Sequence, residues 1–279
     1  MLRSFAQVDV FTRFAAAGNP VAVVVDGDGL ADETMAAFAR WTNLSETTFI
    51  QTPTEPAADY RLRIFTPGGE MPFAGHPTLG SAHVWLSREG ATTRRQIVQE
   101  CGIGLVELRR DGDRLAFAAP GLRRSGAVEP HVLSRVVDAL GVTPDEVVDS
   151  SWVDNGPPWI GVQLGSVERV LELNPDPLAF GALMVGVVAC YPPGGGPDGA
   201  AIEVRAFAPG IGVPEDPVTG SLQAGLAMWL RQTRAVPGRY VAAQGTALGR
   251  AGRVYVADDD SDIWIGGDSV TVISGTVDL

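Results

Sequence analysis

Hydrophobic and polar positions along the first half of the chain predict short strands with few helices. Residues 7–12 and 60–67 alternate polar and apolar side chains, and 20–27 is mostly apolar, as is typical of strands. Residues 31–42 carry acidic side chains early and are followed by Asn43, a residue that tolerates the left-handed conformation at a helix end. We therefore expect a helix over 31–42 between strands.

The second half repeats this arrangement after a polar, turn-rich segment at 121–130. Apolar residues at helical spacing predict a helix over 129–141 that ends at Gly141. Strands are expected over 159–165, 169–173, 185–191, 201–209, 252–259, 262–267 and 269–279. We predict two domains, 1–122 and 123–279, with the last strand a candidate to return to the first.

One stretch of sequence occurs twice. Phe65-Thr66-Pro67 leads into PFAGHPTLGSAHVWL, and Phe207-Ala208-Pro209 leads into PEDPVTGSLQAGLAMWL. When His76 is set against Asp216, the next Pro, Gly and Ser residues coincide, and both stretches end on Trp-Leu. The simplest interpretation is a duplicated α+β domain. Each copy would wrap strands around one apolar helix, and the copies would be related by a pseudo-two-fold axis.

The repeated stretch also predicts a binding site. Pro is favoured in the first helical turn, which makes Asp216 a good helix N-cap and His76 a weaker one. The pairs Gly80-Ser81 and Gly220-Ser221 would keep the first turn thin, so that a ligand or a backbone could approach. Helix N-termini offer unpaired N–H groups and partial positive charge, so two facing termini would bind a small carboxylate. Buried helices with ordinary caps are the alternative for either copy alone.

Glu46 is a candidate proton carrier. It begins a β-branched and aromatic stretch at 47–52, which we predict to be a strand, and its neighbours Leu44, Phe49 and Ile50 suggest burial. Burial raises the pKa of a carboxyl group from about 4.3, and a pKa of roughly 6–7 suits a group that both takes and returns a proton. A surface strand that carries one Glu is the alternative interpretation.

Composition narrows the function further. The net charge of −12 leaves no basic surface for nucleic acid. All 21 basic residues are Arg, which excludes a pyridoxal phosphate Schiff base, a Walker-type phosphate loop and a lysine nucleophile. No apolar run is long enough to span a membrane, and the start of the chain has no signal-peptide core, so we expect a cytoplasmic protein.

Four motifs in order, GNPVAVV, NLSETTF, FTPGGEMPFAGHPT and EDPVTGS, together resemble the phenazine-biosynthesis PhzC/PhzF family. The resemblance continues through AAQGTALGRAGRVYV and IWIGG near the C-terminus. It implies the diaminopimelate epimerase-like fold, with two β-barrel-like halves, each around a central helix, and the site in the cleft between them. It also implies a cofactor-free, metal-free isomerase that acts on a small molecule, and a homodimer.

Residue roles follow from the same resemblance. It implies that Glu46 moves a proton between ring carbons of the substrate, while His76 and Asp216 hold the substrate and assist. Ser45, Gly75, Gly220 and Ser221 match the family's substrate-contacting positions. Leu222-Gln223 stands where many members have Ala-His, which leaves the identity of the substrate open.

Four other functions have partial support in the sequence. A two-thiol racemase of this fold would need a Cys at each motif helix, but Ala74 and Pro217 stand there, and Cys101 and Cys190 lie outside both copies. Glu-based epimerisation stays possible. A dinucleotide site at Gly210-Ile211-Gly212 lacks its third glycine. A metabolite-binding protein without turnover is the non-enzyme alternative.

Overall fold

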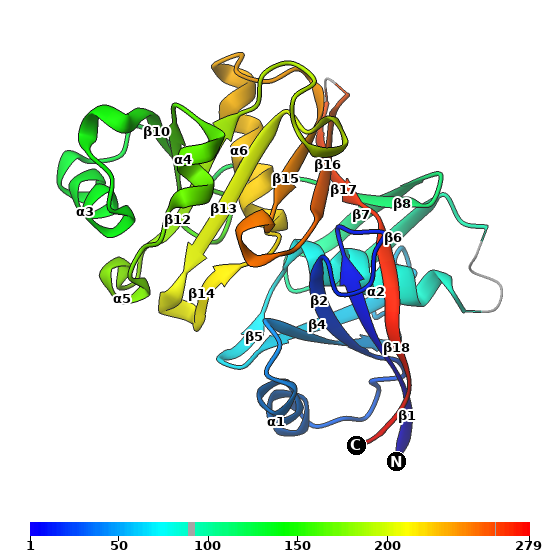
Figure 1. Cartoon of the computed structure of the whole chain (residues 1–279). Coiled ribbons are helices and arrows are strands. Elements are labelled where there is room, and N and C mark those ends of the chain that lie inside the picture. The colour runs from blue at the N-terminus through cyan, green and yellow to red at the C-terminus, as the bar shows by residue number, and fades with distance from the viewer. Residues whose placement is uncertain (89–92, 260) are drawn as a thin grey trace. The chain divides into compact units, whose positions relative to one another are not determined.

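The computed structural model describes residues 1–88, 93–259 and 261–279. The chain divides into two compact units. Met1–Ala118 and Gly266–Leu279 form the first unit, and Ala119–Ile265 form the second. The last strand therefore belongs to the first unit, where the two ends of the chain lie side by side (Figure 1). The amino group of Met1 lies 2.6 Å from Oδ1 of Asp278.

The first unit is built on one curved run of strands. It contains β1 (Leu2–Val10), β2 (Asn19–Val24), β3 (Glu46–Gln51), β4 (Tyr60–Thr66), β5 (Gly69–Met71), β6 (Gln96–Cys101), β7 (Gly104–Asp111), β8 (Arg114–Ala118) and β18 (Ser269–Asp278). Hydrogen-bonded neighbours follow the order β18-β1-β2-β3-β4-β6-β7-β8, and β5 pairs with β4. The pairs β2–β3 and β4–β6 are parallel, and the others are antiparallel. Each parallel pair needs a crossover connection, which helices α1 (Asp32–Thr42) and α2 (Gly75–Leu86) provide.

The second unit repeats this pattern. Its strands are β9 (Arg124–Gly126), β10 (Val147–Asp154), β11 (Trp159–Leu164), β12 (Met184–Cys190), β13 (Ile202–Ala208), β14 (Val213–Asp216), β15 (Arg239–Gln244), β16 (Gly252–Asp258) and β17 (Ile263–Gly267), the last of which ends across the division in the first unit. Its hydrogen-bonded neighbours follow the order β9-β10-β11-β12-β13-β15-β16. The two parallel pairs, β11–β12 and β13–β15, occupy the same positions in this order as β2–β3 and β4–β6 do in the first unit. The duplicated α+β fold expected from the repeated sequence is confirmed.

One apolar helix lies within the strands of each unit (Figure 1). Helix α2 contacts β1, β2, β3, β4, β8 and β18, and most of its residues are buried. Helix α6 (Gly220–Gln232) contacts β10, β11 and β16 in the second unit. A helix that is apolar on all sides is stable only when it is surrounded, so these strands account for the character of the repeated stretch.

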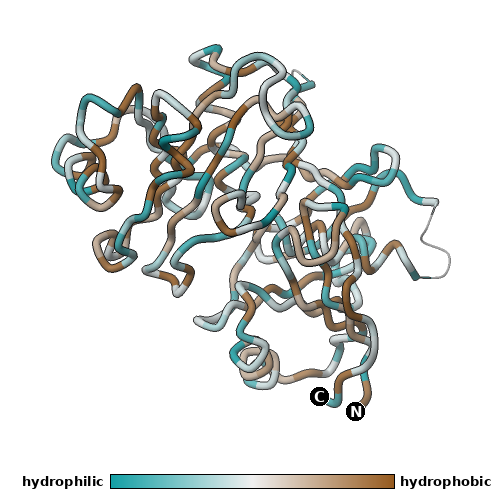
Figure 2. The backbone as a smooth tube through the Cα atoms, in the orientation of Figure 1, coloured by the Kyte–Doolittle hydropathy of each residue, from teal (hydrophilic) through white to brown (hydrophobic). Residues whose placement is uncertain are grey.

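Other helices cover the outer faces of the strands. In the first unit, α1 buries Met35 and Phe38 against Phe49 and Phe65. In the second unit, α3 (Pro130–Leu140), α4 (Val167–Glu172) and α5 (Pro177–Phe180) contribute to a core with β11, β12 and β13. Hydrophobic residues, drawn brown in Figure 2, accordingly recur along the strands of both units.

Two predicted helix ends are confirmed and one predicted strand is wrong. Asn43, with φ of 54°, ends α1, and Gly141, with φ of 65°, ends α3. Residues 169–173, expected as a strand, lie mostly in helix α4. The hydroxyl of Ser166 accepts the N–H of Arg169 and so caps this helix, and burial of Val167 and Val170 one turn apart stabilises it. Within the described ranges, no helix is long and apolar enough to cross a membrane.

Candidate active site

The end of α1 and the start of β3 position Glu46. The left-handed Asn43 reverses the chain, and Glu46 becomes the first residue of β3, in parallel register with Val21 of β2. The next residues of the strand, Thr47 and Thr48, are fully buried. The side chain of Glu46 is only 14% exposed.

The start of helix α2 places His76 against Glu46. Gly75 and His76 are the first two residues of α2, and His76 is 4% exposed. Nε2 of His76 lies 3.3 Å from Oε2 of Glu46. The first unit thus brings together two of the three predicted catalytic residues, although thirty positions of sequence separate them.

The environment of Glu46 tunes its acidity. Burial raises the pKa of Glu46 to about 7, and a hydrogen bond from the Ser45 side chain acts in the opposite direction. Both protonation states are therefore populated near neutral pH, which is what a group that alternates between base and acid requires.

The Asn19 side chain lies against the ring of His76, a contact that the sequence did not predict. Nδ2 of Asn19 lies 3.4 Å from Nδ1 of His76, and both side chains are buried. Because an amide NH₂ group only donates, Nδ1 is the acceptor, and a neutral imidazole then carries its proton on Nε2, facing Glu46. Asp9 holds the turn before Asn19 by accepting the N–H groups of Ala17 and Gly18. The available signal was the GNPVAVV motif, which contains Asn19.

In the second unit, Asp216 is the last residue of β14, and Gly220 and Ser221 begin α6. The hydroxyl of Thr219 donates to Oδ2 of Asp216 over 2.5 Å. Ser221 is held twice, since its Oγ accepts from Trp159 Nε1 at 3.0 Å and its carbonyl accepts from Asn155 Nδ2 at 2.8 Å. Because its oxygen accepts from the indole, the hydroxyl hydrogen of Ser221 remains able to donate to another group.

The predicted helix caps are wrong. The N-cap of α2 is Ala74, which places His76 inside the helix, and the N-cap of α6 is Thr219, which leaves Asp216 and Pro217 outside. Asp216 lies too far from the helix to cap it, because it still pairs with Ala206 of β13. The two copies of the repeated stretch therefore start their helices at different places.

Gly80 allows a close approach, as predicted, but the approach is to a strand and not in the first turn of the helix. It lies in the middle of α2, and a Cβ atom there would lie 2.5 Å from Cγ1 of Val21. Its neighbour Ser81 shares a hydrogen bond of 2.9 Å with Thr48 of β3. Gly80 and Ser81 thus allow α2 to approach the strands and do not form a thin first turn for a ligand.

The structure does not support a thiol mechanism at the two cysteines or a dinucleotide site at residues 210–212. Burial raises the pKa of both Cys101 and Cys190, the opposite of what a nucleophilic thiol needs. Gly210 lies in a short 3₁₀ turn, and the chain then enters strand β14 where a dinucleotide site would require a helix. Within residues 1–88, 93–259 and 261–279, no group of three or more His, Cys, Asp or Glu residues is arranged to hold a metal ion.

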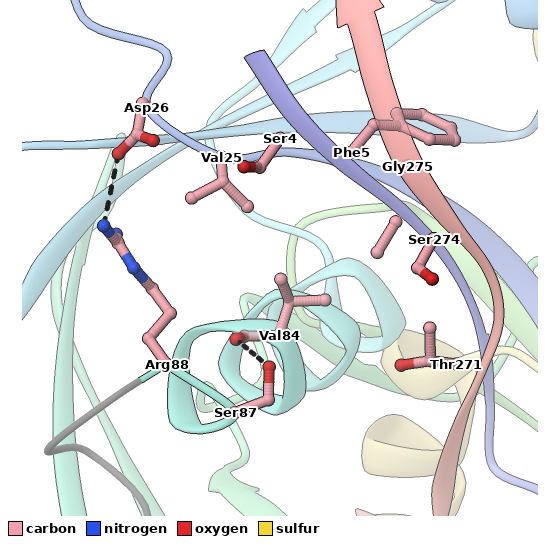
Figure 3. A pocket seen from close by; sticks show the side chains of 11 residues that line it. Ser4, Phe5, Val25, Asp26, Val84, Ser87, Arg88, Thr271, Ser274 and Gly275 are labelled. Atoms are coloured by element: carbon pink, nitrogen blue, oxygen red, sulfur yellow. Dashed lines mark hydrogen bonds and ion pairs between the residues drawn. The ribbon is translucent and has the colours of Figure 1, made fainter.

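A hollow of about 310 Å³ in the first unit lies away from Glu46. Val84, Ser87 and Arg88 near the C-terminal end of α2 line it together with Thr271 and Ser274 of β18 (Figure 3). Arg88 lies 3.3 Å from Asp26 at its rim. His76 stands at the opposite end of a helix about 18 Å long, so this hollow is separate from the candidate site.

The duplicated pattern of strands around a central helix defines an α+β protein of the diaminopimelate epimerase-like fold. The sequence profile of the phenazine biosynthesis-like proteins, PhzC-PhzF, matches residues 8–275. The chain belongs to this family, and it is an isomerase.

Relatives and solved structures agree with this assignment. The trans-2,3-dihydro-3-hydroxyanthranilate isomerase of Pseudomonas aeruginosa is 35% identical, with 91% of this chain and 90% of that protein covered. A protein of Schizosaccharomyces pombe named antisense-enhancing sequence 1 is 37% identical over 98% of this chain and 97% of its own length. The crystal structure of a PhzF family protein from Enterococcus faecalis covers both chains completely, with a TM-score of 0.82 and 26% identity.

Proposed function

We propose that the protein is a cofactor-independent isomerase that moves a proton within a small carboxylated, cyclic or amino-acid-derived metabolite, with Glu46 as the proton carrier. The observation that carries this proposal is the Glu46–His76 pair. A carboxyl group with a pKa raised to about 7 stands 3.3 Å from an imidazole nitrogen in a mostly buried setting.

In the proposed reaction, the Glu46 carboxylate takes a proton from one carbon of the substrate and returns it to another. The electron pair released at the first carbon shifts the double bond, and protonation of the second carbon completes the isomerisation without net change in composition. His76 donates its Nε2–H to the carboxylate of Glu46 or to the substrate as charge moves. Trans-2,3-dihydro-3-hydroxyanthranilate, for which the P. aeruginosa relative is named, is the first compound to try.

The carboxylate of the substrate needs a separate binding group. We assign this role to the first turn of α2, which begins with Gly75 and His76 and carries the partial positive charge of a helix N-terminus. In the second unit, Asp216 is proposed to assist proton movement, and Gly220 and Ser221 to contact the substrate. Ser45 completes the set beside Glu46.

Proton transfer is tested with trans-2,3-dihydro-3-hydroxyanthranilate in D2O, followed by NMR. We expect the Glu46 carboxyl to exchange its proton with D2O before returning it, so that deuterium enters at the carbon that receives the proton, and turnover should be about 10²–10⁴-fold slower in Glu46→Gln. Glu107→Gln, in the exposed face of β7, is the matched control and should leave turnover unchanged. Turnover at the wild-type rate in Glu46→Gln would show that another group carries the proton.

The same spectra separate the two alternatives. A Glu-based epimerase would exchange the proton and return it to the same carbon, so the product would differ in configuration and keep its double bonds in place. A metabolite-binding protein would bind the compound without incorporating deuterium.

A further inference from the structure

Gln244, the last residue of β15, lies fully buried beside the segment that carries Asp216. Its Oε1 accepts the backbone N–H of Thr219 at 3.1 Å, and its Nε2 donates to the backbone carbonyl of Asp216 at 3.1 Å. A backbone N–H can only donate and a carbonyl can only accept, so these two bonds fix which end of the amide is which. Gln244 therefore spans the turn from Asp216 to Thr219.

The same amide reaches the carboxylate of Asp216 through one hydroxyl. Nε2 of Gln244 donates to Oγ1 of Thr219 at 2.9 Å. Because that oxygen accepts from Gln244, the hydroxyl hydrogen of Thr219 is left to donate to Oδ2 of Asp216, 2.5 Å away. A fourth bond, from Nε2 of Gln223 to Oε1 of Gln244 at 2.9 Å, anchors the amide to the first turn of α6.

The first unit shows that the fold itself does not require an amide at this place. Strand β6 pairs in parallel with β4, and its Gln99 lies opposite Tyr60, the first residue of β4. Strand β15 pairs in the same way with β13, and its Ala242 lies opposite Ile202, the first residue of β13. Two residues further along each strand, Cys101 of β6 therefore corresponds to Gln244 of β15. The glycine that follows each of these residues lies against the segment that leads into helix α2 or helix α6. A Cβ at Gly102 would lie 2.6 Å from Cα of Pro72, and a Cβ at Gly245 would lie 2.8 Å from the carbonyl oxygen of Pro217. The same strand end thus forms with a thiol in one unit and an amide in the other.

We propose that Gln244 is a positioning residue for Asp216, acting through Thr219 to hold the Asp216 carboxylate in one orientation. The inference rests on the role proposed above for Asp216. Gln244 itself does not touch the substrate. Its loss should slow the chemical step more than it weakens substrate binding, because a carboxylate displaced by about 1 Å loses rate on the order of 10²-fold.

Gln244→Met tests this by removing all four hydrogen bonds with little change in shape. With trans-2,3-dihydro-3-hydroxyanthranilate we expect kcat to fall about 10- to 100-fold while KM changes little. Val256→Ala in the neighbouring strand β16 removes buried volume away from Asp216, and should lower the melting temperature without lowering kcat. Thr219→Val removes the bridging hydroxyl and should lower kcat to a similar extent, whereas Thr219→Ser keeps the hydroxyl and should retain activity. These two variants test the proposal even if Gln244→Met does not fold.

Combination with Asp216→Asn separates positioning from general damage. If Gln244 acts through Asp216, the double variant should be no slower than Asp216→Asn alone, whereas independent effects would multiply and overturn the proposal. If Gln244→Met keeps the wild-type kcat while Asp216→Asn lowers it, only the positioning role of Gln244 is overturned. If Asp216→Asn also keeps the wild-type kcat, the proposed role of Asp216 is overturned as well.

A crystal structure of Gln244→Met gives a readout that needs no substrate. We expect the Asp216 carboxylate to leave the position in which it accepts from Thr219. An unmoved carboxylate would overturn the proposal whatever compound the enzyme turns over.

Discussion

Nε2 of His76 lies 3.3 Å from Oε2 of Glu46, so the first residues of a strand and of a helix meet at one buried point. Neither side chain alone would mark a site, since single buried polar residues occur in most proteins. Together they place a carboxyl group with a raised pKa beside a group that can share its proton.

Glu46 should cost the protein stability at neutral pH. Because burial raises its pKa from 4.5 to about 7 in the folded state, the folded protein binds this proton more tightly than the unfolded chain does. The contribution of Glu46 to the free energy of unfolding should therefore be most favourable below pH 4.5, and it should be lost as the pH rises through about 7. Glu46→Gln should raise the free energy of unfolding at pH 8 by on the order of 3 kcal/mol, and by much less at pH 4. Urea unfolding at the two pH values measures this, and an equal effect at both would contradict it.

Asn19 should control which nitrogen of His76 is protonated. Asn19→Asp replaces the donor near Nδ1 with an acceptor, so the proton of the imidazole should move to Nδ1 and Nε2 should no longer donate toward Glu46. ¹⁵N chemical shifts of His76 should report the change, and turnover should be at least roughly 10-fold slower. A variant with the shifted proton and unchanged turnover would show that His76 does not assist as a donor.

Two Arg–Glu pairs of the same geometry should differ in strength. Arg63 binds Glu70 through Nε and Nη2 at 2.7 and 2.6 Å, and Arg205 binds Glu215 through the same atoms at 2.8 Å each. The exposed fractions of the side chains are 15% and 43% in the first pair, but 6% and 13% in the second.

Glu215→Gln leaves a buried guanidinium without its counter-charge, and should lower the free energy of unfolding by about 3 kcal/mol. Glu70→Gln should lower it by less than about 1 kcal/mol, since solvent screens that pair and Asp32 also contacts Arg63. Urea unfolding of the two variants side by side measures the difference, and equal losses would refute the dependence on burial.

Small carboxylates should stabilise the protein if the first turn of α2 binds the substrate in this way. Benzoate at a concentration of 100 times its Kd should add about 2.7 kcal/mol to the free energy of unfolding. Benzamide, which has the same shape and no charge, is the control and should have a much smaller effect. Equal stabilisation by both compounds would indicate a hydrophobic pocket without an anion site.

The thiols should be dispensable. Burial raises the pKa of Cys101 and of Cys190, so neither is prepared to act as a base or nucleophile. The double variant Cys101→Ser/Cys190→Ser should turn over substrate close to the wild-type rate. Loss of turnover with unchanged thermal stability would revive a thiol mechanism.

Features with local causes were predictable from the sequence. The ends of α1 and α3 follow from Asn43 and Gly141, which adopt the left-handed conformation, and the strands follow from alternation and β-branched residues. The duplicated fold followed from a repeat in the sequence itself. The candidate residues Glu46 and His76 could be named because an acidic residue in apolar surroundings and a helix start are both local signals.

Features that depend on distant parts of the chain were decided by tertiary structure. Residues 169–173 have strand-like composition, yet 169–172 lie in α4 because Val167 and Val170, one turn apart, are buried in a core with strands β11, β12 and β13. Helix α6 begins after Thr219 because Asp216 is still paired with β13. The partners of the candidate residues, Asn19 beside His76 and Gln244 beside Asp216, approach only when strands pair in a particular register. Local propensities act over a few residues, whereas register and burial are properties of the assembled sheet, and these decide which polar groups meet.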